Sequence, residues 1–336
     1  MVESMLKGEV IPATVDDIPD WMELVDIVKN NFPGLEKESY LATLRRNIAR
    51  KTALCYKENG KIAGILLFSP DQNCLSCIAV HPDYRRIGIA TKLIDKMLVL
   101  LQPDSDITVT TFRECDEKGI APRKLYKKLG FEEAELLMEF GYPVQKFVLH
   151  PNNLENVLGV KRTEVKLAPY REIYNLLFAR EKQKISEAIG ENVIQICHVG
   201  STAIVGAISK PLLDISVCVR DVNSIDIHAM EALGYECMGE YGIPGRCYFV
   251  KRKDGDISTH HVHCFTEGHE NLVNQLLFRD YLNTHPDAVN EYNELKLSLL
   301  EKYPKERRKY TESKADFIIG IIKLAQKDNC NRIDKI

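Results

Sequence analysis

Apolar residues recur at two different spacings in the first half of the chain, and each change of spacing marks a new element. Spacings of three and four residues predict helices over residues 17–30 and 37–49, and a third helix whose apolar stripe runs from Ile87 to Leu101. Asn59-Gly60 lies between two apolar runs and predicts a hairpin with a type I′ turn. Strands are expected in IPATVDD (11–17), in the hairpin (52–69), in CLSCIAVH (74–81), in ITVTTF (107–112) and in FVLH (147–150), and PRKLYKKLGF (122–131) is expected to be a short helix that runs into a strand.

The pattern is interrupted at residues 151–163, where Pro, Asn and Gly replace the periodic residues. We interpret this segment as a linker between a domain of residues 1–150 and a domain of residues 164–336. The second domain is expected to contain a strand VKLAP (165–169), a helix over 170–189, two buried strands VIQICHV (193–199) and LLDISVCV (212–219), two strands around Asp254-Gly255, and helices from Gly268 onward. The expected fold class is α/β (α+β), with a mixed sheet and helices in the first domain and an α/β second domain that ends in a helical part.

Composition narrows the class of protein. A chain of 336 residues exceeds a typical single core, which favours two domains. A net charge of −3 argues against a general nucleic-acid-binding protein. The apolar runs are too short to span a bilayer and the N-terminus lacks the apolar core of a signal peptide, so we expect a cytoplasmic location without membrane association. The ten cysteines would then be reduced, and the pair Cys74 and Cys77 would point to opposite faces of a strand rather than bind a metal together.

The stretch YRRIGIATK (84–92) carries the first candidate site. Arg85 and Arg86 precede Gly88 and Ala90 at the point where the apolar stripe of the third helix begins. The first turn of a helix has unpaired N–H groups and the positive end of the helix dipole. Small side chains let an anion approach those N–H groups, and guanidinium groups add attraction, so the pattern predicts a diphosphate site. The alternative is that the small residues only allow close helix–strand packing.

These residues fit the pattern Arg/Gln-x-x-Gly-x-Gly/Ala between a strand and a helix, and LYKKLGF with Tyr126 follows. Over about residues 8–149 the chain resembles the GNAT family of acyl-CoA N-acyltransferases. The resemblance implies acetyl-CoA as co-substrate and direct transfer to an amine, either a small molecule or a peptide. It implies that one strand end binds the pantetheine arm and that the motif binds the pyrophosphate; the implied residues are Ile78, Ala79, Val80, Arg85, Arg86, Ile87, Gly88, Ile89, Ala90 and Thr91.

The same resemblance assigns Tyr126 as the general acid for the departing thiolate. A phenol with a pKa near 10 suits a thiolate of similar basicity. The alternative is a core tyrosine without a catalytic role. No carboxylate stands out as a general base, and the acceptor pocket is expected on residues 17–49 and near Tyr142.

The second domain carries another candidate site in HVGSTAIVGAISKPLLDISV (198–217), where Gly-Ser ends one strand and Asp214 lies on the next. Residues 164–326 resemble the GrpB family and imply a nucleotidyltransferase-like fold with a phosphate or nucleotide pocket, which would take a nucleotide or a CoA-like ligand, with Mg²⁺ as a candidate cation at Asp214. Ser216 stands where that fold has a second acid, and a neutral hydroxyl is a poor Mg²⁺ ligand. The expected pocket residues are Gly200, Ser201, Lys210, Asp214, Arg246, His261 and His263, with Arg279 and Lys314 as further phosphate contacts.

Three functions follow for the whole chain. The first is an N-acetyltransferase fused to a phosphate- or nucleotide-binding domain. The second is a nucleotidyltransferase-type enzyme with a regulatory domain that binds acetyl-CoA. The third is a ligand-binding regulator without turnover. For the second site itself, the alternative is that His261 and His263 are hydrogen-bonded wall residues.

Overall fold

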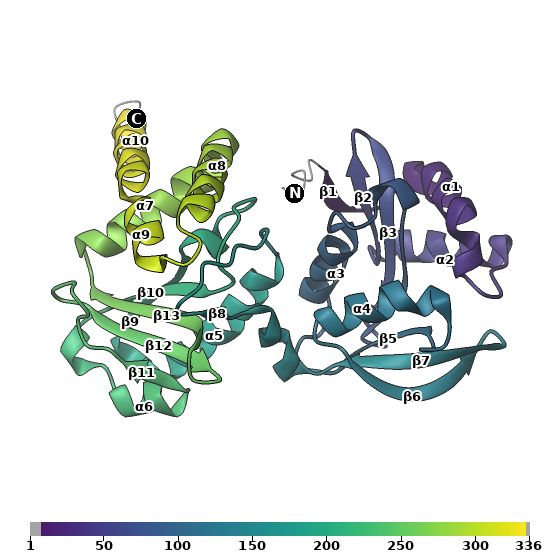
Figure 1. Ribbon diagram of the computed structural model, residues 1–336, viewed down its shortest axis with the longest axis horizontal. Coiled ribbons are helices and arrows are strands. Elements are labelled where there is room, and N and C mark those ends of the chain that lie inside the picture. The colour runs from purple at the N-terminus through teal and green to yellow at the C-terminus, as the bar shows by residue number, and fades with distance from the viewer. Residues whose placement is uncertain (1–7, 334–336) are drawn as a thin grey trace. The chain divides into compact units, whose positions relative to one another are not determined.

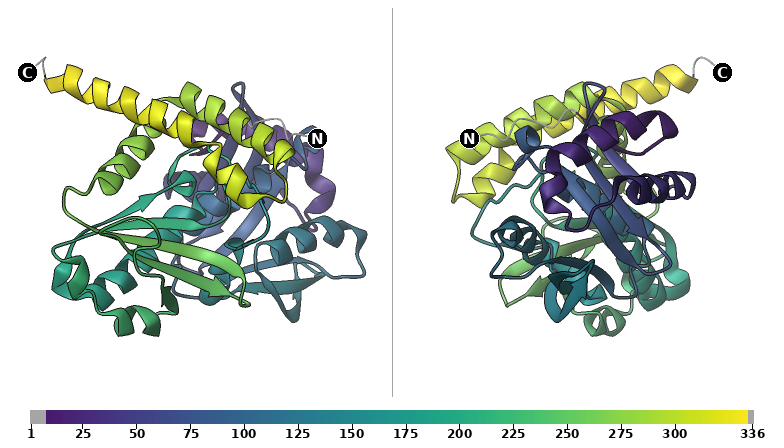
Figure 2. Two further views of the ribbon diagram at one scale, coloured as in Figure 1. Left: turned by 60° about the vertical axis from the view of Figure 1, so that its left-hand side comes forward. Right: turned by 90° about the vertical axis from the view of Figure 1, so that its right-hand side faces the viewer.

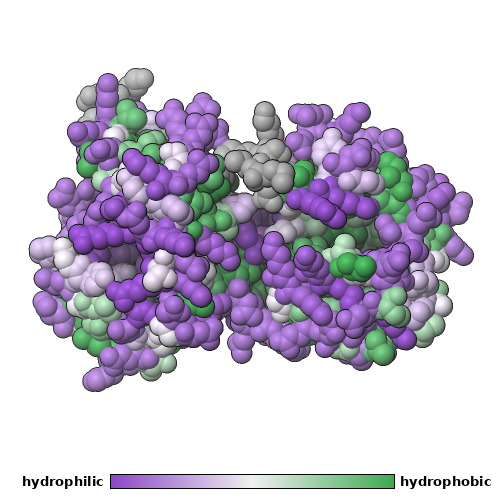
Figure 3. Space-filling view, viewed as in Figure 1, coloured by the Kyte–Doolittle hydropathy of each residue, from purple (hydrophilic) through white to green (hydrophobic). Residues whose placement is uncertain are grey.

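A computed structural model of the protein describes residues 8–333 (Figure 1). The chain divides into two compact units, Met1–Val157 and Leu158–Ile336. The visible face of each unit is largely hydrophilic, with smaller hydrophobic patches (Figure 3). Within the described residues, no helix has both the length and the apolar character needed to cross a membrane.

In the described part of the first unit, seven strands form one sheet with the order β1-β2-β3-β4-β5-β7-β6. All neighbours are antiparallel except β4 and β5, which are parallel. The strands are β1 (Glu9–Pro12), β2 (Ala53–Glu58), β3 (Lys61–Ser69), β4 (Cys74–Val80), β5 (Ile107–Phe112), β6 (Glu132–Glu139) and β7 (Tyr142–Leu149). The expected hairpin is confirmed as β2 and β3, and both Asn59 (φ 52°) and Gly60 (φ 78°) have the positive φ of a type I′ turn.

Helices cover both faces of this sheet, and the expected helices are confirmed. They are α1 (Ile18–Val28), α2 (Lys37–Ala49), α3 (Ile89–Leu100) and α4 (Ile120–Lys128). Trp21 of α1 packs into a core with Ile65 of β3. The preceding residue of that strand, Gly64, lies under Ile89 of α3. Because neighbouring residues in a strand point to opposite faces, α1 and α3 lie on opposite sides of the sheet.

The second unit contains a smaller sheet with the order β11-β12-β13-β10-β9, and the short strand β8 pairs with β13. Only β10 and β13 run parallel among these described strands. The strands are β8 (Val160–Lys161), β9 (Val193–Val199), β10 (Leu213–Val219), β11 (Tyr235–Cys237), β12 (Cys247–Lys253) and β13 (Ile257–Thr266).

The helical end of the second unit packs over the loop that follows β9. The helices of this unit are α5 (Ile173–Ile189), α6 (Ile227–Ala232), α7 (Glu270–Thr284), α8 (Pro286–Lys302), α9 (Arg307–Glu312) and α10 (Ala315–Ile333). Phe278 of α7, Tyr292 of α8 and Ile321 of α10 form one buried cluster with Ile204. The long helices α8 and α10 are visible in both views of Figure 2.

Several expectations differ from the structure. VKLAP is not a strand: within it only Ala168 forms a bridge, to Ser209, and Pro169 has no N–H to extend a ladder. The segment expected as a linker contains a 3₁₀ helix (Pro151–Val157) and β8. IPATVDD leaves the sheet after Pro12. The first three residues of β9 are not buried, whereas its last four are.

Candidate functional site

A slot opens in the first sheet between its two parallel strands. Strands β4 and β5 pair only at Cys74 with Thr108 and at Leu75 with Val109. Beyond that point β4 continues to Val80 but pairs only with β3. Its last residues are half-buried rather than buried, because no strand covers their second side.

The closed end of the slot is fixed by one buried side chain. Asn73, which is 9% exposed, donates its amide N–H groups to the backbone carbonyls of Gln102, Ser105 and Asp106 at 3.0–3.3 Å. Its own amide oxygen accepts the Gln102 N–H at 3.0 Å. This one residue therefore ties the start of β4 to the loop that leads into β5.

The open end of the slot presents backbone groups of β4. The His81 N–H donates to the Ala63 carbonyl across from it at 2.9 Å. Hydrogen-bonding groups alternate in direction along a strand, so Ile78 and Val80 direct their N–H and C=O groups away from β3 and toward the slot. Two of the strand residues that the resemblance assigns to acyl-CoA binding thus face the slot, and the Val80 carbonyl among their groups already accepts a bond from Arg85.

Helix α3 begins beside this slot. Gly88 caps it with φ 98°, a left-handed conformation that favours glycine, and Arg86 also has a positive φ of 65°. Gly88 is exposed, while Ile89 is buried and anchors the first turn. A Cβ at Gly64 would lie 2.6 Å from Ile89 Cγ2, so this glycine of β3 allows the helix to approach the sheet closely. The first turn of α3, with its unpaired N–H groups, therefore begins at a small, exposed residue next to the slot.

The two arginines before the helix do not have the same role. Arg85 Nε donates to the carbonyl of Val80 at 3.2 Å and so ties the loop to the end of β4. Both side chains are exposed. Part of the Arg85 guanidinium is thus used within the protein, which the sequence did not predict.

Tyr126 lies inside the first unit, on α4. It is 2% exposed, and its ring packs against Phe131 and Phe147 at centroid distances of 5.6 and 5.9 Å. Burial, together with the nearby thiol of Cys77, raises the pKa of Tyr126 well above its ordinary value. Its phenol is therefore protonated at neutral pH, as a proton donor must be.

On the side of the sheet that α1 and α2 cover, Trp21, Tyr40 and Cys77 form a chain of polar contacts. Trp21 Nε1 donates to the Tyr40 hydroxyl at 3.1 Å, and that hydroxyl lies 3.6 Å from Cys77 Sγ. Burial raises the pKa of Cys77 to about 11, so it is a neutral thiol. Sequence reasoning placed both helices near the acceptor but could not single out Tyr40. Tyr142, also expected near the acceptor, donates to the Asp116 carboxylate at 2.5 Å.

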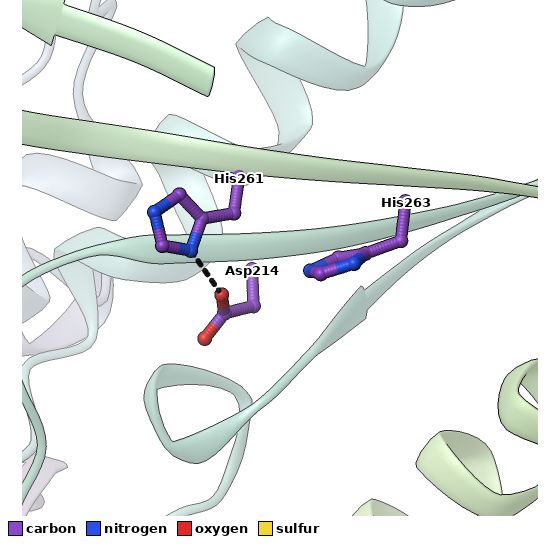
Figure 4. A group of neighbouring side chains, drawn as sticks. All are labelled: Asp214, His261 and His263. Atoms are coloured by element: carbon purple, nitrogen blue, oxygen red, sulfur yellow. Dashed lines mark ion pairs between the residues drawn. The ribbon is translucent and has the colours of Figure 1, made fainter. Parts of the chain in front are cut away.

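In the second unit, Asp214 and two histidines meet on adjacent parallel strands (Figure 4). The register pairs Asp214 of β10 with His261 of β13, and Ser216 with His263. Asp214 Oδ1 lies 3.2 Å from His261 Nδ1, and one nitrogen or oxygen atom of each of Asp214, His261 and His263 lies within 4.8 Å of the others. The expected grouping of these three side chains is present in the structure.

The Gly-Ser turn after β9 closes over this group. Gly200 has φ 68°, and a Cβ there would collide with the Asp214 carboxylate. Ser201 Oγ lies 3.4 Å from the Tyr292 hydroxyl of α8. Glycine is therefore required at this position by both its conformation and its neighbour.

A cavity of about 900 Å³ lies above these residues. Residues of the predicted pocket that line it are Gly200, Ser201, Lys210, Asp214, His261, His263 and Lys314. Arg162 of the segment expected as a linker and Arg307 of α9 also line it. No local pattern in the sequence identifies either arginine, because each lies far along the chain from Asp214.

Two arginines expected as phosphate contacts, Arg246 and Arg279, donate hydrogen bonds within the protein. Arg246 does not line the cavity; its guanidinium donates to the carbonyls of Glu240 and Tyr241 at 2.8–3.1 Å and to His263 Nδ1 at 3.2 Å. Arg279 donates to the carbonyl of His198 at 2.9 Å. Backbone carbonyls thus accept hydrogen bonds from guanidinium groups that the sequence analysis assigned to phosphates.

The donor set does not fit Mg²⁺, which prefers six oxygen ligands. One carboxylate and two imidazoles offer only one oxygen-bearing side chain among the clustered residues. Ser216 is fully buried and its hydroxyl is bonded to the side chain of Gln275. Arg246 also donates an N–H to His263 Nδ1. In a metal-binding histidine the ring nitrogen that does not bind the metal normally donates its own N–H, whereas Nδ1 of His263 accepts one.

Comparisons with known proteins divide the chain in the same way. The sequence model of the GNAT acetyltransferase family matches residues 21–131, and that of the GrpB protein matches residues 164–324. UPF0157 protein YqkA of Bacillus subtilis (strain 168) is 32% identical over 268 residues, which cover 78% of this chain and 74% of that protein. Glutamate-rich protein GrpB of Alkalihalophilus pseudofirmus is 36% identical over 171 residues, covering 49% of this chain and 98% of that protein.

Solved structures also resemble each half of the chain separately. The crystal structure of conserved protein GrpB from Enterococcus faecalis is 32% identical and covers 49% of this chain and 99% of that one, with a TM-score of 0.46. A GNAT-family acetyltransferase from Bacillus cereus ATCC 10987 is 23% identical and covers 42% of this chain and 95% of that one, with a TM-score of 0.35. The first unit thus carries an acyltransferase-type domain of the GNAT family, and the chain belongs to the GrpB (UPF0157) family.

Proposed function

We propose that the first unit transfers an acetyl group from acetyl-CoA directly to an amine. The observation that carries this proposal is the slot between β4 and β5 next to the glycine-capped start of α3. The slot offers strand-like pairing, and the helix start offers N–H groups for an anion. A molecule with amide groups at one end and a pyrophosphate at the other matches both, and the GNAT family match agrees with acyl-CoA as that molecule.

The backbone would do most of the binding. Ile78 and Val80 would pair with the pantetheine arm, and Ala79 lies between them. The N–H groups from Arg86 to Thr91 would bind the pyrophosphate. N–H donors of the strand would polarise the thioester carbonyl, in the manner of an oxyanion hole.

Tyr126 would protonate the leaving group. The amine nitrogen attacks the carbonyl carbon, the C–S bond breaks, and the thiolate takes the phenolic proton. The attacking amine gives its extra proton to solvent, and solvent returns a proton to the Tyr126 phenolate. Tyr126 is protonated at neutral pH, and burial raises its pKa above the value that would match the thiolate, so the phenol is a weaker proton donor than a free tyrosine.

The acceptor that we propose is a small-molecule or peptide amine, entering from the side of α1 and α2. The nine cysteines whose side chains the structure describes are free thiols. Free thiols are typical of a reducing compartment, and the cytoplasm is therefore the location that we propose.

The test is transfer of a labelled acetyl group from acetyl-CoA to a panel of small amines and lysine peptides. Tyr126→Phe should lower kcat by about 10²-fold or more, because proton transfer typically contributes that much. Tyr303→Phe, in the second unit, is the matched control and should leave the rate unchanged. If no amine is acetylated, the transferase proposal fails; if Tyr126→Phe keeps the full rate, only the general acid is wrong.

For the second unit we propose binding of a phosphate-bearing ligand, either a nucleotide or a CoA-like molecule. The cavity at Asp214 combines basic side chains with Tyr241, whose ring is 57% exposed on its lining and can stack on a base. Binding of ATP and of CoA to the full chain tests the ligand class. Release of pyrophosphate from ATP with Mg²⁺ would instead favour a nucleotidyltransferase-type enzyme with a regulatory first unit.

A further inference from the structure

The cavity of the second unit carries an excess of positive charge. Its basic lining residues are Arg162, Lys210, Arg252, Arg307, Arg308 and Lys314, and its acidic ones are Asp214 and Glu312. Arg252 pairs with Glu236, and Arg308 pairs with Glu312 at 2.7 Å. Lys210, Arg307 and Lys314 lie near Asp214, which already pairs with His261.

One buried ring brings two of these basic groups together. Tyr310 of α9 is fully buried. Lys210 Nζ lies 5.8 Å from the centroid of this ring, and Lys314 Nζ lies 4.9 Å from it. Arg307, on the same helix as Tyr310, is held by a bond of 3.1 Å to the carbonyl of Lys161. The loop after β9 and helix α9 thus converge with their cations on one side of the cavity.

Burial and mutual repulsion disfavour the charged forms of these basic groups. Burial, together with the charges of Lys314 and Arg307, lowers the pKa of Lys210 to about 7. Burial also lowers the pKa values of Lys314 and Arg307. Like charges repel, and Asp214 is the nearby acid that opposes them. A bound polyanion would relieve the repulsion.

We propose that this site binds a di- or triphosphate group directly through Lys210, Arg307 and Lys314, without a divalent cation. The inference rests on the proposed phosphate-binding function and goes further by naming the group bound and what neutralises it. Nucleotide-binding sites commonly offset phosphate charge with Mg²⁺ held by carboxylates. Here the carboxylate positions are reduced to Asp214, and basic side chains supply the positive charge instead.

Isothermal titration of the full chain with inorganic tripolyphosphate tests the proposal, once in excess EDTA and once in excess MgCl₂. We expect binding in EDTA that is at least as tight as in MgCl₂, because Mg²⁺ neutralises the ligand that the lysines recognise. Binding only in MgCl₂ would overturn the metal-free site but leave the phosphate pocket standing. Binding in neither buffer would overturn both.

Variants identify the residues. Arg307→Ala and Lys314→Ala should each weaken tripolyphosphate binding at least tenfold in EDTA. Lys309→Ala is the matched control, since this lysine of the same helix is 61% exposed, pairs with Glu306 and does not line the cavity, and it should change the affinity less than twofold. Circular dichroism confirms that each variant is folded. If folded Arg307→Ala and Lys314→Ala bind as the control does, the anion lies elsewhere and the assignment fails.

Discussion

The indole N–H of Trp21 donates to the hydroxyl of Tyr40 at 3.1 Å, inside the core of the first unit. Trp21 is fully buried, so its N–H has no access to water. Tyr40→Phe should destabilise the protein by about 1–3 kcal/mol, the usual cost of an unpaired buried donor. Urea unfolding measures this. Tyr241→Phe removes a hydroxyl from a tyrosine that is 57% exposed and should have no such effect; an equal loss in both variants would show that the bond is unimportant.

Glu181 of α5 should make the second unit sensitive to acid. Burial alone would raise its pKa, but the charges of His260, Lys251 and Lys184 and a bond to Lys251 lower the pKa of Glu181 to about 2. The Tyr235 hydroxyl also donates to it at 2.9 Å. A carboxylate with a lowered pKa stabilises the fold above its unfolded pKa, and this stability is lost as the pH falls towards 2.

Glu181→Gln should therefore cost about 3 kcal/mol at pH 7, because it breaks a buried ion pair. The cost should shrink between pH 5 and pH 2, where the wild type also loses the charge. Unfolding free energies across this range measure it. Equal pH dependence in the variant and the wild type would contradict the assignment.

Gly88→Ala tests the helix start beside the slot. Alanine in a left-handed conformation costs roughly 1–2 kcal/mol and displaces the first turn. We expect the KM for acetyl-CoA to rise about tenfold, if the affinity of the N–H groups is lost by about 1.4 kcal/mol. Gly60→Ala introduces similar strain (φ 78°) in the hairpin turn, with nothing near the added Cβ. Gly60→Ala should lower the stability by a similar amount but leave the KM for acetyl-CoA unchanged. If the KM rises in both variants, general instability and not the helix start explains the effect.

Lys210 should make anion binding depend on pH. Its lowered pKa of about 7 means that the ammonium is lost as the pH rises from 6 to 9, and with it part of the attraction for tripolyphosphate. Lys314 and Arg307 act against its charge and Asp214 supports it. Lys210→Arg keeps the charge throughout, so its affinity should fall less over this range. The ligand titrates identically in both experiments, and parallel curves would exclude Lys210 as the titrating group.

Features that depend only on residues close together in the chain could be predicted from the sequence. Asn59-Gly60 specifies its turn by itself, and the stripe from Ile87 to Leu101 matches α3. Asp214, His261 and His263 could be grouped from sequence because strands with a strong apolar pattern carry them at fixed alternation. Both families were likewise identified from motifs within single segments.

The rest depends on which distant segments meet. Nothing in the sequence distinguishes Arg246 from Arg307. The guanidinium of Arg246 donates to a loop carbonyl, whereas Arg307 lines the cavity. Lys296 was not singled out at all; it is 1% exposed, and burial together with the charge of Lys314 lowers its pKa to about 6. No periodicity distinguishes a lysine that faces a core from one that faces water, because its long side chain suits either.

The slot between β4 and β5 also shows how the first sheet is joined. The four strands β1 to β4 and the three strands β5 to β7 are joined by only two residue pairs, next to Asn73. Asn73 has a positive φ of 47° and is bonded to the loop before β5, so the joint between the two half-sheets is anchored at one point. On each side of this joint the strands keep a continuous ladder of their own. Among the described strands, the sheet is therefore two ladders that share a single short seam, and the slot is the part of that seam that the backbone does not close.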